Sequence, residues 1–100
     1  MAKLPIRLQK NKIERFCKKH HIAYLALFGS VLTSSFTEKS DIDFLVKFEK
    51  KHIPHLLGLI GMESELSEII GYPVDLKTPN DLSRYFRDDV LAKAQTIYGK

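Results

Sequence analysis

A long apolar run is missing from this 100-residue sequence: none approaches the ~20 residues that span a bilayer, and no charged-then-apolar leader opens the chain. We therefore expect a cytoplasmic protein with no membrane partner. Cysteine is almost absent too, since Cys17 stands alone. A single cysteine excludes an internal disulfide and is a poor start for a metal site. We predict that Cys17 is a small core residue on a helix.

The length leaves room for one domain, residues 1–100, with a real core but no space to enclose two bulky substrates. Hydrophobic residues make up 44% of the chain and charged residues 28%, a balance typical of a soluble globular protein. The four histidines have no other metal-ligating residues around them in a spacing typical of a metal site. We expect surface or core-edge positions for them: His20, His21, His52 and His55.

The net charge is +4, and the basic residues gather at the start of the chain. Seven of them precede position 20: Lys3, Arg7, Lys10, Lys12, Arg15, Lys18 and Lys19. Such a cluster suits an acidic partner or a polyanion, but it equally fits a solvated helix face. No aromatic residues are interleaved as stacking platforms, so we favour the solvated face and do not expect direct nucleic-acid binding.

Hydrophobic periodicity predicts a small α/β sandwich with helices packed on a sheet of at least three strands. In chain order the predicted elements are a helix over about 9–20, strands over 22–29 and 41–48, a helix over about 54–70, a strand over 72–78 and a last helical region from Pro79. The 54–70 helix should end at Gly71 and turn these residues inward: Leu56, Leu57, Ile60, Leu66, Ile69 and Ile70. The last region carries its apolar residues at helical spacing: Leu82, Phe86, Val90, Leu91, Ala94 and Ile97.

Two aspartates stand at the start of the second predicted strand, where burial of a charged side chain would be unfavourable. Side chains alternate along a strand, so Asp41 and Asp43 point to one face about 6.5–7 Å apart. Carboxylates at that spacing can both reach a pair of hard cations ~3.5–4 Å apart, the arrangement used for nucleotidyl displacement. Asp75 joins them if its strand pairs beside theirs.

A glycine and a serine follow the first predicted strand. Gly29 lets the backbone approach a phosphate closely, and a helix that starts at Ser30 would offer N–H groups and a hydroxyl to it. The turn and the acidic strand together predict a nucleoside triphosphate bound through magnesium.

Gly29-Ser30, ten intervening residues and Asp41-Ile42-Asp43 resemble the signature of the DNA polymerase beta-like nucleotidyltransferase superfamily, and the small size is similar to its minimal nucleotidyltransferase branch. The likeness extends to Asp75 and to the end of the chain. It implies a polymerase beta-like palm with a mixed sheet, ATP as substrate and two Mg²⁺ ions. It also implies that Asp41 and Asp43 hold both ions, that Asp75 assists the catalytic ion and the incoming hydroxyl, and that Gly29 and Ser30 hold the triphosphate.

The chain departs from this pattern between the serine and the aspartates. Members of the branch often carry an arginine there that steadies the leaving pyrophosphate, whereas this chain has Thr33, Ser34 and Ser35. Hydroxyls can donate to phosphate but bring no charge. Lys77 could supply the cation, although a solvated lysine is the simpler interpretation.

Since we expect one module in the chain, we expect the acceptor to arrive on another molecule. The resemblance implies a separately encoded, helical HEPN-type toxin, with AMP transferred from ATP to a tyrosine of that toxin by this chain as its antitoxin. The basic first helix could help it dock. Two alternatives stay open: an antitoxin that binds without catalysis and keeps a relic site, and one subunit of a transferase that acts on a small molecule such as an aminoglycoside.

Overall fold

The computed structural model describes residues 4, 6–37 and 39–99. Lys3 of the basic cluster lies outside the described residues. The elements in chain order are α1 (Lys10–Lys19), β1 (Ile22–Phe28), the 3₁₀ turn η1 (Gly29–Leu32), β2 (Ile42–Phe48), α2 (Leu56–Ile70), β3 (Val74–Lys77), the 3₁₀ turn η2 (Pro79–Asp81), α3 (Arg87–Lys93) and β4 (Gln95–Gly99). Within the described ranges, no helix has the length and apolar character needed to cross a bilayer.

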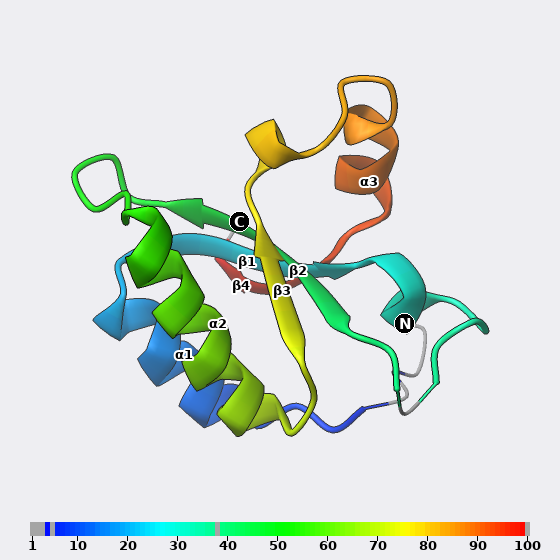
Figure 1. The fold of residues 1–100 in the computed structure, drawn as a ribbon, viewed down its shortest axis with the longest axis horizontal. Coiled ribbons are helices and arrows are strands. Elements are labelled where there is room, and N and C mark those ends of the chain that lie inside the picture. The colour runs from blue at the N-terminus through cyan, green and yellow to red at the C-terminus, as the bar shows by residue number, and fades with distance from the viewer. Residues whose placement is uncertain (1–3, 5, 38, 100) are drawn as a thin grey trace.

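A mixed four-stranded sheet in the order β3-β2-β1-β4 forms the centre of the fold (Figure 1). β1 pairs antiparallel with β2 and with β4, while β3 runs parallel to β2. The parallel pair needs a crossover, and α2 provides it. The predicted small α/β sandwich with helices packed on a mixed sheet is confirmed.

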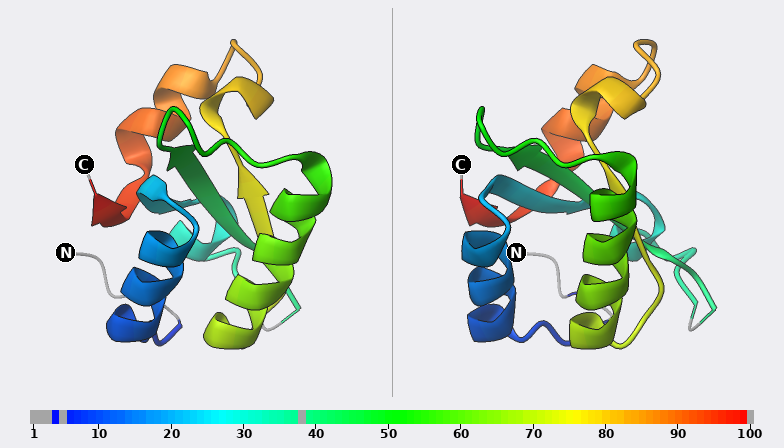
Figure 2. Two further views of the ribbon diagram at one scale, coloured as in Figure 1. Left: turned by 90° about the vertical axis from the view of Figure 1, so that its left-hand side faces the viewer. Right: turned by 60° about the vertical axis from the view of Figure 1, so that its left-hand side comes forward.

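The two faces of the sheet are covered differently. Helices α1 and α2 lie side by side on one face, whereas η2 and α3 lie beyond the other (Figures 1 and 2). The larger core lies under α1 and α2 and includes Phe16, Cys17, Phe44 and Leu66. Burial raises the pKa of the Cys17 thiol to about 12, so this cysteine is a packing residue, as expected.

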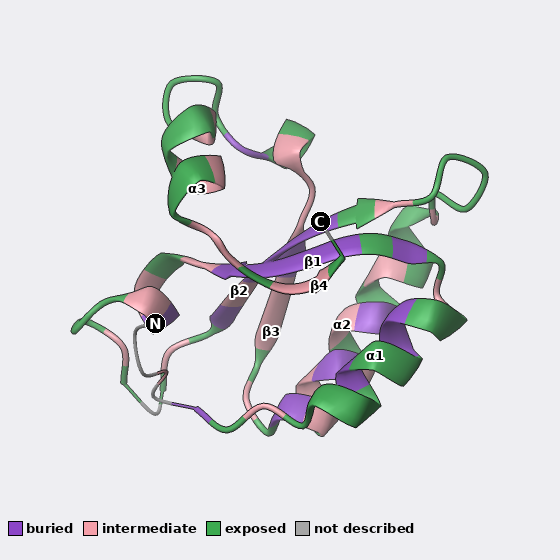
Figure 3. Ribbon diagram, turned by 180° about the vertical axis from the view of Figure 1, so that it is seen from behind, coloured by how far each residue is buried: buried purple, intermediate pink, exposed green. Residues whose placement is uncertain are grey.

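A smaller core lies on the opposite face of the sheet. It contains Tyr24, Ala26, Leu45 and Leu82, with Val90 of α3 packed against it. The central strand β1 is therefore buried along most of its length (Figure 3). Because η2 and α3 are short, they cover only part of this face. The candidate site lies on the part that stays open.

The prediction for the inward face of α2 was partly wrong. Leu66 and Ile70 are buried, together with Met62, but Leu56 and Leu57 are 72% and 82% exposed. Ile60 is exposed as well, since it shares a stripe of the helix with Leu56 and the exposed Ser64. An apolar composition alone cannot tell which stripe of a helix meets the sheet.

The prediction of one last helical region was also partly wrong. The structure has a short turn, the seven-residue helix α3, and then β4, which includes Ile97 and pairs with β1. Ala94 adopts an extended backbone and ends the helix. A strand at the edge of β1 satisfies backbone groups along that edge, a gain that helical spacing in the sequence does not reveal.

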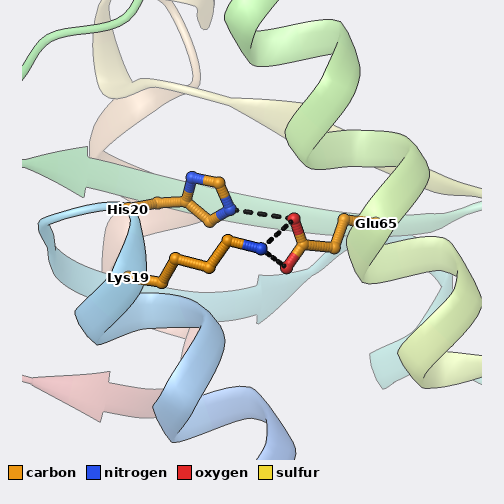
Figure 4. Close-up of polar contacts among 3 residues, drawn as sticks. All are labelled: Lys19, His20 and Glu65. Atoms are coloured by element: carbon orange, nitrogen blue, oxygen red, sulfur yellow. Dashed lines mark hydrogen bonds and ion pairs between the residues drawn. The ribbon is translucent and has the colours of Figure 1, made fainter.

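Five of the described basic residues before position 20 lie on α1, which packs on the sheet face away from the candidate site: Lys10, Lys12, Arg15, Lys18 and Lys19. Lys19 donates to both carboxylate oxygens of Glu65 on α2, at 3.1 and 3.0 Å, and His20 lies 3.0 Å from the same carboxylate (Figure 4). Lys18 pairs with Glu14 at 2.9 Å. Part of the positive charge is thus neutralised within the chain, while Lys12 and Arg15 are exposed.

Candidate functional site

Three neighbouring strands bring the predicted site residues together. Phe28, the last residue of β1, is the antiparallel partner of Asp43, so Gly29 follows directly beside that carboxylate. On the other side of β2, Asp43 is the parallel partner of Asp75. The sequence could only make the contribution of Asp75 conditional on this pairing, and the structure shows the pairing.

Alternation along β2 separates the core from the carboxylates, as predicted. Ile42 and Phe44 are fully buried in the core under α1 and α2, so Asp43 between them turns to the other face. Asp43 is half-buried there, and Asp41 is exposed immediately before the strand. The side chain of Asp75 is 39% exposed. The carboxylates are open to solvent and to a ligand.

The electrostatics of Asp43 fit a cation site. Partial burial raises the pKa of its carboxyl, and the negative charges of Asp75 and Asp41 raise it further. Lys77 lowers it, but not enough to reverse the direction. A bound divalent cation would remove this cost of holding the ionised form.

The three carboxylates do not meet at one point. Among the described residues, the oxygens of Asp41, Asp43 and Asp75 do not form a group within 4.8 Å of one another. Hard cations prefer such oxygen ligands. A pair of ions ~3.5–4 Å apart can be bound by carboxylates that lie farther apart than the ligands of one ion. The donor chemistry of these carboxylates therefore fits Mg²⁺.

Gly29 is packed tightly against Asp43. Its φ is +79°, a backbone conformation that side chains other than glycine rarely adopt, and a Cβ placed on it would lie 3.2 Å from Cγ of Asp43 and closer to a carboxylate oxygen. The turn that follows is a four-residue 3₁₀ helix from Gly29 rather than the helix expected at Ser30. Thr33 closes it, because its N–H and its hydroxyl both donate to the Ser30 carbonyl at 2.9 Å.

A pocket of about 550 Å³ opens beside this turn. The turn side of its lining includes Gly29 and Thr33, and the α3 side includes Asp89 and Lys93. Lys93 pairs with Asp89 at 3.2 Å. Sequence reasoning missed Lys93, because 60 positions separate it from Thr33 and the fold alone brings them together.

Lys77, suggested above as the replacement cation, has another partner. Its ammonium nitrogen lies 3.3 Å from Oδ2 of Asp75. This ion pair places the Lys77 ammonium beside the third carboxylate on β3, whereas the Gly-Ser turn follows β1, two strands away. Lys93, which also has a carboxylate partner in Asp89, lines the pocket with Gly29.

We expected no other metal-ligating side chains near the histidines, and this was wrong for His21 and His52. His21 and His52 lie with Glu49 in a group whose possible ligand atoms are all within 4.8 Å of one another. The sequence hides this group, since β1 and β2 must pair before His21 meets the other two.

Known proteins that are similar to this chain are nucleotidyltransferases by family or by name. A family model described as polymerase beta, nucleotidyltransferase, matches residues 11–100. A Methanocaldococcus jannaschii protein that is named, provisionally, a protein adenylyltransferase is 35% identical over 88% of this chain and 92% of its own length. The protein adenylyltransferase MntA of Thermococcus cleftensis is 37% identical over 67% of this chain and 66% of its own length.

Solved structures share the fold. A chain described provisionally as a minimal nucleotidyltransferase has a TM-score of 0.70 at 29% identity, covering 86% of each chain. A toxin-antitoxin structure with AMP-PNP gives a TM-score of 0.74 at 21% identity, covering 93% of this chain and 75% of that one. A complex of a tri-AMPylated Shewanella oneidensis HEPN toxin with an MNT antitoxin gives 0.65 at 20% identity, covering 91% and 70%.

Proposed function

The chain belongs to the polymerase beta nucleotidyltransferase family and carries a nucleotidyltransferase domain, and we propose that it is the antitoxin of a separately encoded HEPN-type toxin. In this proposal it transfers AMP from ATP, with Mg²⁺, to a tyrosine hydroxyl of that toxin. Relatives named as protein adenylyltransferases and the AMPylated HEPN toxin seen with an MNT antitoxin support the assignment.

One observation carries the proposal. Gly29, Asp43 and Asp75 come from three segments of the chain and lie side by side on the open face of the sheet. A turn that tolerates no side chain, next to acidic oxygens that repel each other, has no advantage for stability. The same arrangement suits a triphosphate and its cations.

The residues take distinct roles in this reaction. Asp41 and Asp43 would hold Mg²⁺, which supplies charge to the phosphates and to the attacking oxygen. The Gly29 backbone and the Ser30 hydroxyl bind the triphosphate. The tyrosine oxygen attacks the α-phosphorus, the bond to the bridging oxygen breaks, and pyrophosphate leaves. Asp75, which pairs with Lys77 at 3.3 Å, would accept the tyrosine proton.

Lys93 completes the site by supplying the cation that the turn lacks. We expect Lys93→Gln to weaken ATP binding about 3- to 10-fold, because a charge-assisted contact to phosphate from an exposed side chain is worth about 1 kcal/mol. Calorimetric titration with ATP and Mg²⁺ measures the change. Thr33→Arg in the Lys93→Gln background should recover the affinity, since Thr33 lines the same pocket.

The matched control is Lys51→Gln, an exposed lysine in the turn after β2. It removes the same charge from the other end of the strand and should leave ATP affinity unchanged. Equal affinities for wild type and Lys93→Gln would remove Lys93 from the site.

A second candidate, an antitoxin that inhibits by binding alone, is favoured by one observation: Thr33 and its neighbours carry no charge on the turn. ATP labelled at the α-phosphate separates the two. With Mg²⁺ and the toxin, an enzyme transfers the label to the toxin, and a chelator abolishes the transfer. A toxin that is inhibited but unlabelled would support the binder.

A further inference from the structure

We propose that His21, Glu49 and His52 bind a divalent transition-metal ion such as Zn²⁺, at the end of the sheet remote from the aspartates. His21 immediately precedes β1 and Glu49 immediately follows β2, so strand pairing places them beside each other. His52 follows in the turn that leads to α2. The three residues thus belong to two connections that meet at one edge of the molecule.

Backbone hydrogen bonds fix this geometry before any metal binds. The Glu49 N–H donates to the His21 carbonyl at 2.9 Å, and the His52 N–H donates to the Glu49 carbonyl at 2.9 Å. His21 has φ +55°, the one positive φ among the described residues other than glycine. A left-handed backbone at a non-glycine residue is uncommon and is retained where the surroundings hold it.

The three side chains lie close together. The imidazole rings of His21 and His52 stack with centroids 3.6 Å apart and an interplanar angle of 12°. The possible ligand atoms of the three residues lie within 4.8 Å of one another. Zn²⁺ bonds of about 2.0–2.2 Å need the ligands closer, roughly 3.5 Å apart. Ring rotation that brings the nitrogens together has to break the stack of the two imidazoles, but all three residues are exposed, so no core packing opposes it.

The donor set selects the metal. Two imidazoles and one carboxylate suit Zn²⁺, Co²⁺, Ni²⁺ or Cu²⁺, whereas Mg²⁺ and Ca²⁺ prefer oxygen ligands only. Three protein ligands leave a fourth position open to water or to a group from another molecule. The neighbouring His20 is engaged elsewhere, with its Nε2 3.0 Å from Oε1 of Glu65.

The site is separate from the nucleotide chemistry. Asp43 and Glu49 are six positions apart along an extended strand, which corresponds to about 20 Å. A metal at His21, Glu49 and His52 therefore cannot contact a nucleotide held by Gly29 and Asp43. It would instead tie the start of β1 to the turn before α2.

Titration of the tag-free protein with Zn²⁺ tests the proposal. We expect binding of one ion, a rise in Tm, and at least about 10-fold weaker binding for His52→Ala and for Glu49→Gln, since each removes a ligand. His21→Gly removes the third ligand and tolerates the positive φ, so it should fold and also lose affinity. Co²⁺ should give a visible absorption band that His52→Ala abolishes.

Two controls decide where the ion is. His55→Ala removes a nearby histidine outside the group and should bind Zn²⁺ as wild type does. Asp43→Asn should also retain the affinity. Loss of Zn²⁺ binding in Asp43→Asn, or equal binding by wild type and a folded His21→Gly/His52→Ala double variant, would overturn the site.

Discussion

Asp43→Asn should lower Mg²⁺-dependent AMP transfer by about 1,000-fold or more, because the amide cannot replace a carboxylate that holds the cations through the displacement step. Asp43 lies at the centre of the site, paired with Phe28 on one side and with Asp75 on the other. Single-turnover transfer to the toxin measures the loss. Glu68→Gln, an exposed carboxylate on α2 across the sheet, is the matched control and should keep wild-type transfer.

The same substitution should not destabilise the fold. Folding raises the pKa of Asp43 above its ordinary value of 3.8, so the ionised group costs stability, a cost absent below pH 3.8 and complete above the raised pKa. We therefore expect Asp43→Asn to raise Tm by about 2–5 °C at pH 7 in metal-free buffer. The gain should shrink as the pH falls toward 3.8. An unfolded Asp43→Asn protein would assign the residue to structure instead.

Gly29→Ala should damage both the site and the fold. The sequence alone suggests that phosphate binding would suffer most, but the structure adds a stability cost, since a Cβ at φ +79° meets the carboxylate of Asp43. We expect a loss of about 1–3 kcal/mol in the free energy of unfolding and a fall in AMP transfer of at least about 100-fold. Denaturant unfolding and the transfer assay measure the two effects.

Gly61→Ala provides the contrast for this prediction. Gly61 lies inside α2, and a Cβ added there meets no atom within 4 Å. Alanine should stabilise the helix by about 0.5–1 kcal/mol and leave transfer unchanged. If Gly29→Ala behaves like Gly61→Ala, the turn has no role in binding the nucleotide.

Local signals in the sequence were sufficient for three of the four strands and for part of the site. The alternation over 41–48 correctly separated the buried Ile42 and Phe44 from Asp43, because successive side chains of a strand point to opposite faces of the sheet. Gly71 correctly marked the end of α2, where φ is +86°.

Features that depend on long-range pairing could not be predicted. Lys93 reaches the pocket beside Gly29 because α3 lies over that face of the sheet, and Ile97 becomes part of a strand because β1 offers an edge. His21 meets His52 only after β1 and β2 pair. None of these contacts produces a periodic pattern in the sequence.

Intact-mass measurement of the toxin, after incubation with this chain, ATP and Mg²⁺ and after separation of the two proteins, tests the central claim most directly. The proposed reaction predicts a toxin heavier by one or more AMP units that stays inactive once alone, and an unmodified toxin when Asp43→Asn replaces the wild type. A toxin of unchanged mass that regains its activity on separation from the wild-type chain would contradict the enzymatic account.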